Sequence, residues 1–317
     1  MKQEDVTLAY ECAKLYYRRG SSQEEVAVAL GISRPKVSRL LALAQKLGIV
    51  TITVRPPDIF DQTRLEQRLS AQYGLKRVLI GIPEDNVEPV VRRAIVSRFI
   101  ESLPSFLSAK TRIGVGLGCT IYEMARALRP DGSAPADMSV TPLMGVAGQS
   151  DPAYQINTIV DLLAESFHAE RKYLMTPAIC ESPSQKKAFL ASPQVAAVVE
   201  RWSSLDTAIF GLGKPIEESA VLFSSFPEKY LVQMVQRHAV GDVLARFFDA
   251  QGTMVCPDAD SVSLSIPLAT LLRVPERVCL AGGARKQAGI RAALKSGLVT
   301  TLITDLFTAQ LLAEQEE

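Results

Sequence analysis

From Arg77 onward, short runs of β-branched residues alternate with segments whose apolar residues recur at helical spacing. The runs predict strands at 77–82, 112–116, 139–144, 208–210, 278–281 and 300–303. The segments between them predict helices at 86–107, 119–128, 155–168, 185–202 and 286–296. This alternation is typical of an open, mostly parallel sheet covered by helices, and ligands bind such sheets beyond the carboxyl ends of the strands. We therefore predict an α/β domain with its ligand site at that edge.

The first 57 residues have a different pattern, and a chain of 317 residues is long enough for about two domains. Helical spacing predicts helices over 5–18 and 23–30 and a third from the Ser33 N-cap to about Leu47. After the third helix, residues 49–54 are predicted to form a strand. Two short helices joined by a glycine-containing turn are a helix-turn-helix unit, whose second helix enters the DNA major groove.

Basic and hydroxylic residues gather in the first half of that third helix. The DNA-binding candidates are Ser33, Arg34, Lys36, Val37, Ser38 and Arg39. Arginine side chains can donate to guanine, whereas serine and lysine can contact phosphates. The helical period also turns the Val37 side chain inward, together with Leu40 and Leu41. The alternative is a small helical bundle with a solvated basic face. A DNA-binding helix is favoured because the glycine turn, the Ser33 N-cap, Pro35 and the predicted strand occur together around these basic residues.

The charge of the chain is unevenly divided. Residues 1–57 contain nine Lys or Arg and five Asp or Glu, so they carry +4, and the remainder must carry −3 of the total of +1. A basic segment on a mildly acidic body agrees with a nucleic-acid reader joined to a second domain.

Several classes of protein are excluded or disfavoured. No apolar run reaches the roughly 20 residues of a membrane span, and the first five residues are too polar to open a signal peptide, so we expect a cytoplasmic protein with no membrane partner. Five cysteines without a C-x-x-C pair and two histidines predict neither a disulfide framework nor a metal site. A nucleotide-dependent motor is excluded because no G-x-x-x-x-G-K-[ST] motif occurs.

Three glycine-rich segments, 113–120, 209–215 and 279–290, lie at predicted strand ends. In the first, the glycines precede Thr120 and a helix, an arrangement that exposes amides to an anion such as phosphate. Its G-x-G-x-G spacing is not the dinucleotide fingerprint. The alternative to a phosphate-binding role is that the glycines let the strand and the helix pack closely. In the third, Arg285 and Lys286 begin a helix, where the helix dipole disfavours cations unless an anion binds there.

Longer motifs add a resemblance that covers nearly the whole chain. They are SRPKVSRLLALAQKLGIVTITV, GLGCT, YQINTIVDLLAE, FGLG, AVGDVLARFFDAQG, AGGARKQAGIRAAL and LITDLFTAQLL. Together they resemble the SorC family of bacterial sugar-binding transcriptional regulators. The resemblance implies a helix-turn-helix domain over 1–57 and a Rossmann-like α/β domain over 58–317 that binds the effector and oligomerises. It further implies operator DNA and a phosphorylated sugar as partners and a homotetramer. We expect no cofactor.

The resemblance also assigns roles to individual residues. Gly118, Cys119 and Thr120 would hold the phosphate, and Lys286 would pair with it. Gln155 would face the sugar, Asp242 would accept from its hydroxyls, and Asn157 would shape the loop. This sequence departs from the family pattern at Cys119 and Met144, where other members carry groups able to bind phosphate, and at Asp305-Leu306, where an acidic pair is usual.

An active sugar-phosphate isomerase or deaminase with a DNA-binding appendage is the alternative function. Chemistry at a sugar carbonyl needs a positioned acid and base. Asp242 and Lys286 are candidates for that pair, but the three glycine-rich segments contain no histidine. We therefore expect a non-enzymatic regulator, a repressor or an activator, in which effector binding is coupled to DNA binding.

Overall fold

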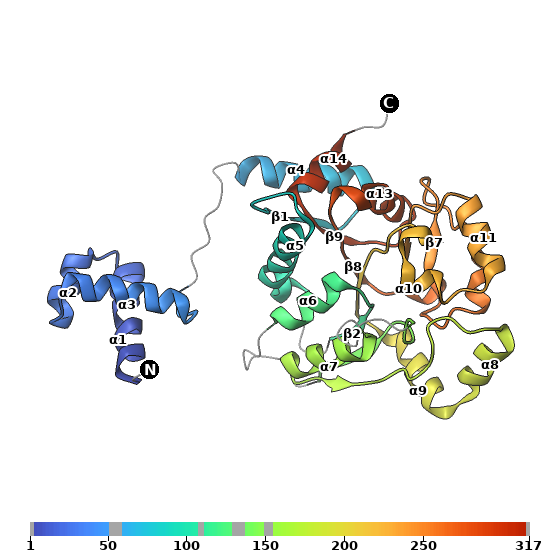
Figure 1. Cartoon of the computed structure of the whole chain (residues 1–317), viewed down its shortest axis with the longest axis horizontal. Coiled ribbons are helices and arrows are strands. Elements are labelled where there is room, and N and C mark those ends of the chain that lie inside the picture. The colour runs from blue at the N-terminus through green and yellow to red at the C-terminus, as the bar shows by residue number, and fades with distance from the viewer. Residues whose placement is uncertain (1–2, 51–58, 107–110, 129–136, 149–154, 315–317) are drawn as a thin grey trace. The chain divides into compact units, whose positions relative to one another are not determined.

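The structure is a computed structural model that describes residues 3–50, 59–106, 111–128, 137–148 and 155–314. The chain divides into two compact units, Met1–Ile59 and Phe60–Glu317 (Figure 1). The boundary predicted between residues 57 and 58 lies outside the described residues, as do positions 51–54 of the predicted strand. Residues 49 and 50 of that strand are described and are not in a strand.

The first unit is helical. Its elements are α1 (Gln3–Ala13), a π-helical turn (Lys14–Arg18), α2 (Gln23–Leu30) and α3 (Arg34–Lys46). The helix predicted over 5–18 is therefore two elements, α1 and the π-helical turn. Ser22 and Glu25 form a reciprocal capping box at the start of α2, and Gly31 ends α2 with a left-handed φ of 63°.

Seven parallel strands form the sheet of the second unit, in the order β1-β9-β8-β5-β2-β3-β4. The strands are β1 (Arg77–Gly81), β2 (Arg112–Val115), β3 (Ser139–Pro142), β4 (Glu170–Arg171), β5 (Thr207–Gly211), β8 (Glu276–Leu280) and β9 (Thr301–Asp305). All six predicted strands are present in this sheet. The two-residue β4 at its edge was too short to be predicted.

Helices cover both faces of this sheet (Figure 1). Four of the predicted helices correspond to α5 (Glu88–Ser102), α6 (Cys119–Ala127), α7 (Ile156–Phe167) and α13 (Gln287–Lys295). Two further helices are α4 (Ile59–Tyr73), which precedes the first strand, and α14 (Leu306–Ala313), which follows the last one. The single helix predicted over 185–202 is wrong: α8 (Pro183–Ala191) and α9 (Pro193–Arg201) are separate. Ser192 adopts an extended conformation because the proline that follows disfavours the helical one.

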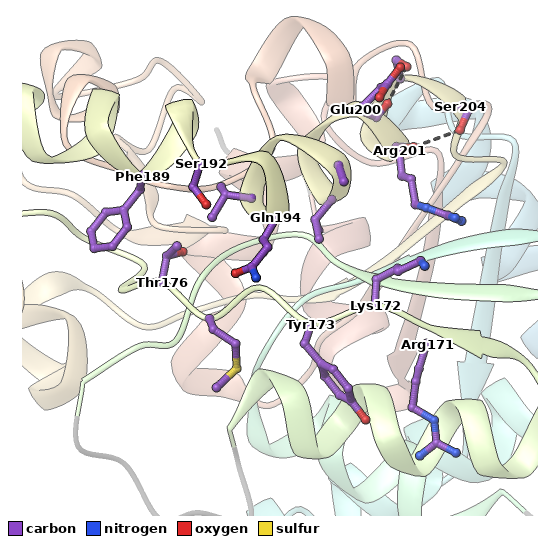
Figure 2. Close-up of a pocket in the computed structure, with 15 residues that line it drawn as sticks. Arg171, Lys172, Tyr173, Thr176, Phe189, Ser192, Gln194, Glu200, Arg201 and Ser204 are labelled. Carbon is purple, nitrogen blue, oxygen red and sulfur yellow. Dashed lines mark hydrogen bonds between the residues drawn. The ribbon is translucent and has the colours of Figure 1, made fainter.

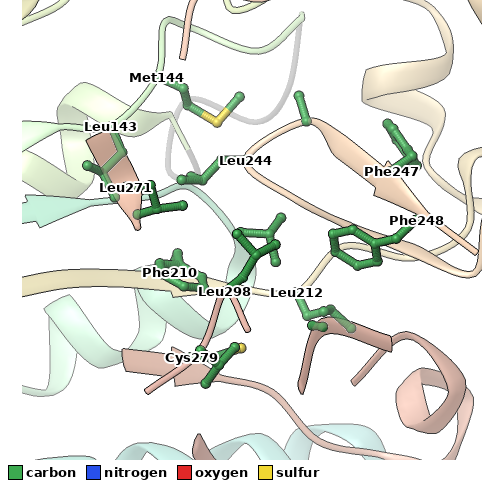
Figure 3. Packing of buried hydrophobic residues seen from close by; sticks show 14 of the residues in the cluster. Leu143, Met144, Phe210, Leu212, Leu244, Phe247, Phe248, Leu271, Cys279 and Leu298 are labelled. Carbon is green, nitrogen blue, oxygen red and sulfur yellow. The ribbon is translucent and has the colours of Figure 1, made fainter. Parts of the chain in front are cut away.

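A two-stranded antiparallel hairpin, β6 (Gly241–Val243) and β7 (Arg246–Phe248), lies outside the main sheet. Its turn places Leu244 and Ala245 at φ values of 53° and 63°. A two-residue hairpin turn of this hand requires positive φ at both positions, which non-glycine residues adopt at a cost. The turn stays in place because Leu244 is buried among Leu143, Phe210 and other apolar residues (Figure 3). The Asp242 carboxylate also accepts a hydrogen bond from the Ala245 amide.

Two hydrophobic clusters flank the sheet. One contains α5, α6 and α7 residues such as Phe99, Ile121 and Ile159. The other contains residues of the β6–β7 hairpin, α9 and α14; Figure 3 shows the part of it around Leu244, Phe247 and Phe248. Because helices cover both faces, the inner strands β2, β3, β5, β8 and β9 are mostly buried, as expected for parallel sheets. Across the described part of the chain, no helix is both long and apolar enough to cross a membrane.

Candidate functional site

The N-terminal half of α3 presents its polar residues to solvent. Ser33, Arg34, Lys36, Ser38 and Arg39 are all exposed. The prediction that Val37 contacts DNA is wrong: its side chain is fully buried in the core of the unit and supports α3 from inside. Arg34 contacts Glu24 at 3.8 Å, and both side chains are largely exposed. Exposed pairs of this kind contribute little, so Arg34 can leave Glu24 for another anion.

The effector candidates all line one cavity of about 320 Å³. They are Gly118, Cys119, Thr120, Gln155, Asp242 and Lys286. These residues are spread over 169 positions of the sequence, yet the carboxyl ends of β2, β5 and β8 and the β6–β7 hairpin bring them together. This is the edge at which open parallel sheets bind ligands.

The N-terminus of α6 opens onto this cavity. Gly118 is its N-cap, with a φ of 138° that favours glycine, and no side chain of the described residues caps the first turn. Cys119 and Thr120 follow, one exposed and one half-buried. Uncapped amides and the positive end of the helix dipole suit an anion. Packing explains the preceding glycine, because a Cβ atom at Gly116 would come within 2.9 Å of Leu244.

Asp242 is a buried carboxylate at the wall of the cavity. Its Oδ2 accepts from the Ala245 amide at 2.9 Å, while Oδ1 has no hydrogen-bond partner among the described residues. Burial raises the pKa of the carboxyl to about 6, against the opposing effects of the Ala245 amide and the Lys286 charge. An unsatisfied buried carboxylate oxygen is costly, and a ligand hydroxyl would satisfy it.

Lys286 approaches the same cavity from the start of α13. Its Nζ donates to the Leu212 carbonyl at 2.7 Å, and burial lowers its pKa. The loop before it is anchored by the Gly283 amide, which donates to Asp305 Oδ2 at 3.0 Å and Thr308 Oγ1 at 2.8 Å. Asp305 also caps α14, so the carboxylate of the LITD motif fixes the loop that presents Lys286.

Gln155 is the N-cap of α7 and donates weakly to the Gly148 carbonyl, at 3.5 Å. Asn157, two residues later, does not line the cavity; its amide instead contacts the Met175 sulfur at 3.2 Å. The arrangement thus offers a cation, free helix amides, a carboxylate acceptor and an amide side chain. That set can bind a polyhydroxylated anion.

Comparisons with known proteins agree with this fold. The family model described as a putative sugar-binding domain matches residues 57–314. The sorbitol operon regulator of Klebsiella pneumoniae is 28% identical over 311 residues, which cover 98% of each chain. The crystal structure of the full-length sorbitol operon regulator SorC superposes with a TM-score of 0.87 at 27% identity, covering 99% of this chain and 100% of that chain.

This chain belongs to the SorC family of sugar-binding transcriptional regulators. A second relative of similar extent is the deoxyribonucleoside regulator of Bacillus subtilis, 28% identical over 314 residues, or 98% of this chain and 99% of that one. These proteins are named as regulators and not as enzymes, so the isomerase or deaminase alternative is not favoured.

Several charged residues at the 320 Å³ cavity were not predicted from the sequence. Glu88 and Arg92 on α5 and Lys214 after β5 also line it. A second cavity of about 500 Å³ shares these three residues, together with Thr120 and Lys286, and adds Arg285. Lys214 directly follows the FGLG motif and was within reach of motif analysis. The helical pattern of α5 indicates which residues are buried but gives no sign that Arg92 faces a ligand.

A larger hollow of about 1050 Å³ lies elsewhere, between α9 and the segment that follows β4 (Figure 2). None of the predicted effector residues lines it. Its arginines are already paired: Arg171 contacts Asp161 at 2.9 Å, and Arg201 contacts Glu170 at 2.9 Å. With its guanidinium groups neutralised by protein carboxylates, this hollow is a poor anion site despite its size, and the smaller cavity is the better effector candidate.

Proposed function

We propose that this protein regulates a carbohydrate catabolic operon and that its effector is a phosphorylated sugar or polyol bound in the 320 Å³ cavity. The observation that carries the proposal is the convergence of Thr120, Lys286 and Asp242 on one cavity at the carboxyl edge of the sheet. The named relatives support a sugar-derived effector, since one is a sorbitol operon regulator and another a deoxyribonucleoside regulator. The protein acts in the cytoplasm, where operator DNA lies.

The cations at the cavity support an anionic effector. Lys214 has no hydrogen bond or ion pair with another described residue, and Lys286 donates only to a main-chain carbonyl. Together with the uncapped amides of α6, they favour a dianion over a neutral sugar. Asp242 and Gln155 at the same cavity provide partners for sugar hydroxyls.

The exposed basic half of α3 is proposed to read operator DNA through Ser33, Arg34, Lys36, Ser38 and Arg39. We propose a homotetramer as the assembly, because helix-turn-helix readers act on paired half-sites and the family resemblance implies four copies. Effector binding then shifts the arrangement of the assembly and changes its affinity for DNA.

A thermal-shift screen tests the effector class, because a ligand of the native state raises apparent stability. Sorbitol 6-phosphate, fructose 6-phosphate and deoxyribose 5-phosphate are each compared with their unphosphorylated parents. We expect at least one phosphorylated compound to stabilise the protein and to change its operator footprint. Equal stabilisation by a parent sugar would contradict the anionic effector. Turnover of a sugar phosphate that Asp242→Asn abolishes would support the enzymatic alternative instead.

A further inference from the structure

Arg92 lies where an anionic ligand is expected, although nothing in the sequence pattern marks it. It extends from α5 to line both the 320 Å³ cavity and the adjoining 500 Å³ cavity, and its side chain is 17% exposed. Cys119 and Met144, which also line the first cavity, provide no cation. Lys214 lines the same cavity, and Arg92 is placed to provide a further cation, a guanidinium, beside Lys286.

The guanidinium of Arg92 is shared by two carboxylates of unequal exposure. Nη1 donates to Glu123 Oε1 at 2.8 Å, which ties α5 to α6. Nη2 donates to Glu88 Oε1 at 2.9 Å. The Glu88 side chain is 62% exposed, whereas that of Glu123 is 35% exposed. Because the Glu88 carboxylate is the more exposed of the two, its contact is the more readily exchanged, while the Glu123 contact keeps the guanidinium in position.

Glu88 is also the one acidic residue on the wall of the second cavity, as far as the described residues go. Four cations line that cavity with it: Arg92, Lys214, Arg285 and Lys286. Arg285 and Lys214 have no ion pair with any described residue. A carboxylate in this cationic surrounding occupies the kind of place that suits a phosphate, and its charge would repel a bound dianion. The Glu88 carboxylate therefore has to move away when the anion binds.

We propose that Arg92 is a specificity-determining residue of the effector site, which binds the anionic group of the effector in exchange for Glu88. Glu88 thus holds the guanidinium in the effector-free protein and competes with the ligand. This inference rests on the proposed function, because it needs an anionic effector at the cavity. It adds the prediction that affinity is set partly by a carboxylate that the ligand displaces.

The test compares Arg92→Gln, Glu88→Gln and the control Arg93→Gln in the full chain. Arg93 is the next residue on α5 but is exposed and lines neither cavity. The probes are inorganic phosphate and sorbitol 6-phosphate, fructose 6-phosphate and deoxyribose 5-phosphate with their parents, titrated by calorimetry. We expect Arg92→Gln to lose at least about tenfold in affinity for the phosphorylated probe that binds wild type, and Arg93→Gln to match wild type. Glu88→Gln should bind that probe several-fold more tightly.

The tighter binding expected for Glu88→Gln cannot result from misfolding, since a damaged protein does not bind more tightly. The Glu88→Gln variant also leaves the contact between Arg92 and Glu123 intact. If wild type binds a phosphorylated probe but Arg92→Gln keeps full affinity, or Glu88→Gln weakens binding, the exchange is wrong and the proposed function stands. If none of the anions, inorganic phosphate included, binds wild type, the anionic effector itself is wrong, and the inference is overturned with it.

Discussion

The carboxylate of Asp242 lies directly against the α-carbon of Gly213, where a Cβ atom would come within 1.6 Å of Oδ1. The Gly213 amide in turn donates to the Asp242 carbonyl at 2.9 Å. The glycine turn after β5 and the β6–β7 hairpin are thus fitted together around one carboxylate. Only a residue without a side chain at 213 leaves Asp242 in its place at the cavity wall.

Gly213→Ala should therefore displace the Asp242 carboxylate and weaken effector binding. The new methyl group overlaps Oδ1, so either the carboxylate rotates or the turn moves, and both spoil the acceptor for a ligand hydroxyl. Calorimetry with the effector found in the thermal-shift screen measures the loss, which we expect to exceed tenfold. Gly283→Ala is a comparison of a different kind. A Cβ atom at residue 283 would meet open space, but the alanine would have to adopt a φ of 95°, so this variant introduces backbone strain without a side-chain overlap. An unchanged affinity in Gly213→Ala would show that Asp242 does not need this fit.

Asp242→Asn should change how stability depends on pH. The folded-state pKa of about 6 is above the unfolded value, so the stabilising contribution of Asp242 is present below about pH 4 and lost as pH rises through 6. Asparagine does not ionise, so the variant should gain on wild type by on the order of 3 kcal/mol between pH 4 and 7. Urea unfolding followed through Trp202, the single tryptophan, which is buried in the second unit, measures this. A difference that stays constant with pH would contradict the raised pKa.

Cys119 should be the one thiol of the native protein that reacts rapidly with a disulfide reagent. It is exposed at the cavity, whereas Cys12, Cys180, Cys256 and Cys279 are buried, and burial raises the pKa of each of those four thiols. Only the thiolate reacts, so the buried groups should react after unfolding. Counting released thiolate by absorbance, with Cys119→Ser as control, checks the number. Effector should slow the reaction; equal rates with and without it would place the ligand elsewhere.

Lys286→Ala should greatly reduce the preference for a phosphorylated ligand over its parent while effector-free DNA binding stays near normal. The variant removes a full charge from the cavity, and Thr120→Ala should act more mildly because it removes one neutral hydrogen bond. Lys187→Ala, an exposed lysine on α8, is the matched control. Calorimetry of the ligand pair measures the preference. Its full retention in Lys286→Ala would mean that the phosphate is bound by other groups.

Arg34→Ala and Arg39→Ala should each weaken specific DNA binding by about 1–3 kcal/mol if the arginine forks onto a base. Both are exposed in the first half of α3, and Lys46, exposed in its last turn, is the control. Footprinting or gel-shift titration on the operator, at fixed salt, measures the change. An operator footprint of the double variant equal to that of wild type would rule out α3 as the groove-reading helix.

The sequence predicted the sheet and much of the cavity because both depend on local signals. β-branched runs that alternate with helical segments define the strands, and parallel strands place their carboxyl ends together, so the sequence predicts Thr120 and Lys286 at one edge. The break between α8 and α9 was also readable, since Pro193 cannot follow a helical residue without strain.

Other features have no local signal. The Leu244–Ala245 turn places two non-glycine residues at positive φ, which no turn propensity predicts; packing from distant segments holds it. The role inferred for Arg92 depends on the spacing between α5 and α6, and the register of one helix against another is set by the whole core. Val37 shows the converse, because its helical position predicted burial even though its neighbours in sequence are exposed.

The position of β9 has a consequence for how the chain is made. In the described sheet, β1 pairs only with β9, which lies between β1 and β8. At ribosomal rates of about 5–20 residues per second, β1 must wait tens of seconds after its own synthesis for a neighbour. Asp305, which anchors the Lys286 loop, also arrives last. The helix-turn-helix unit can fold long before that. A prematurely terminated chain would therefore keep the DNA-reading unit and lose the sensing of effector.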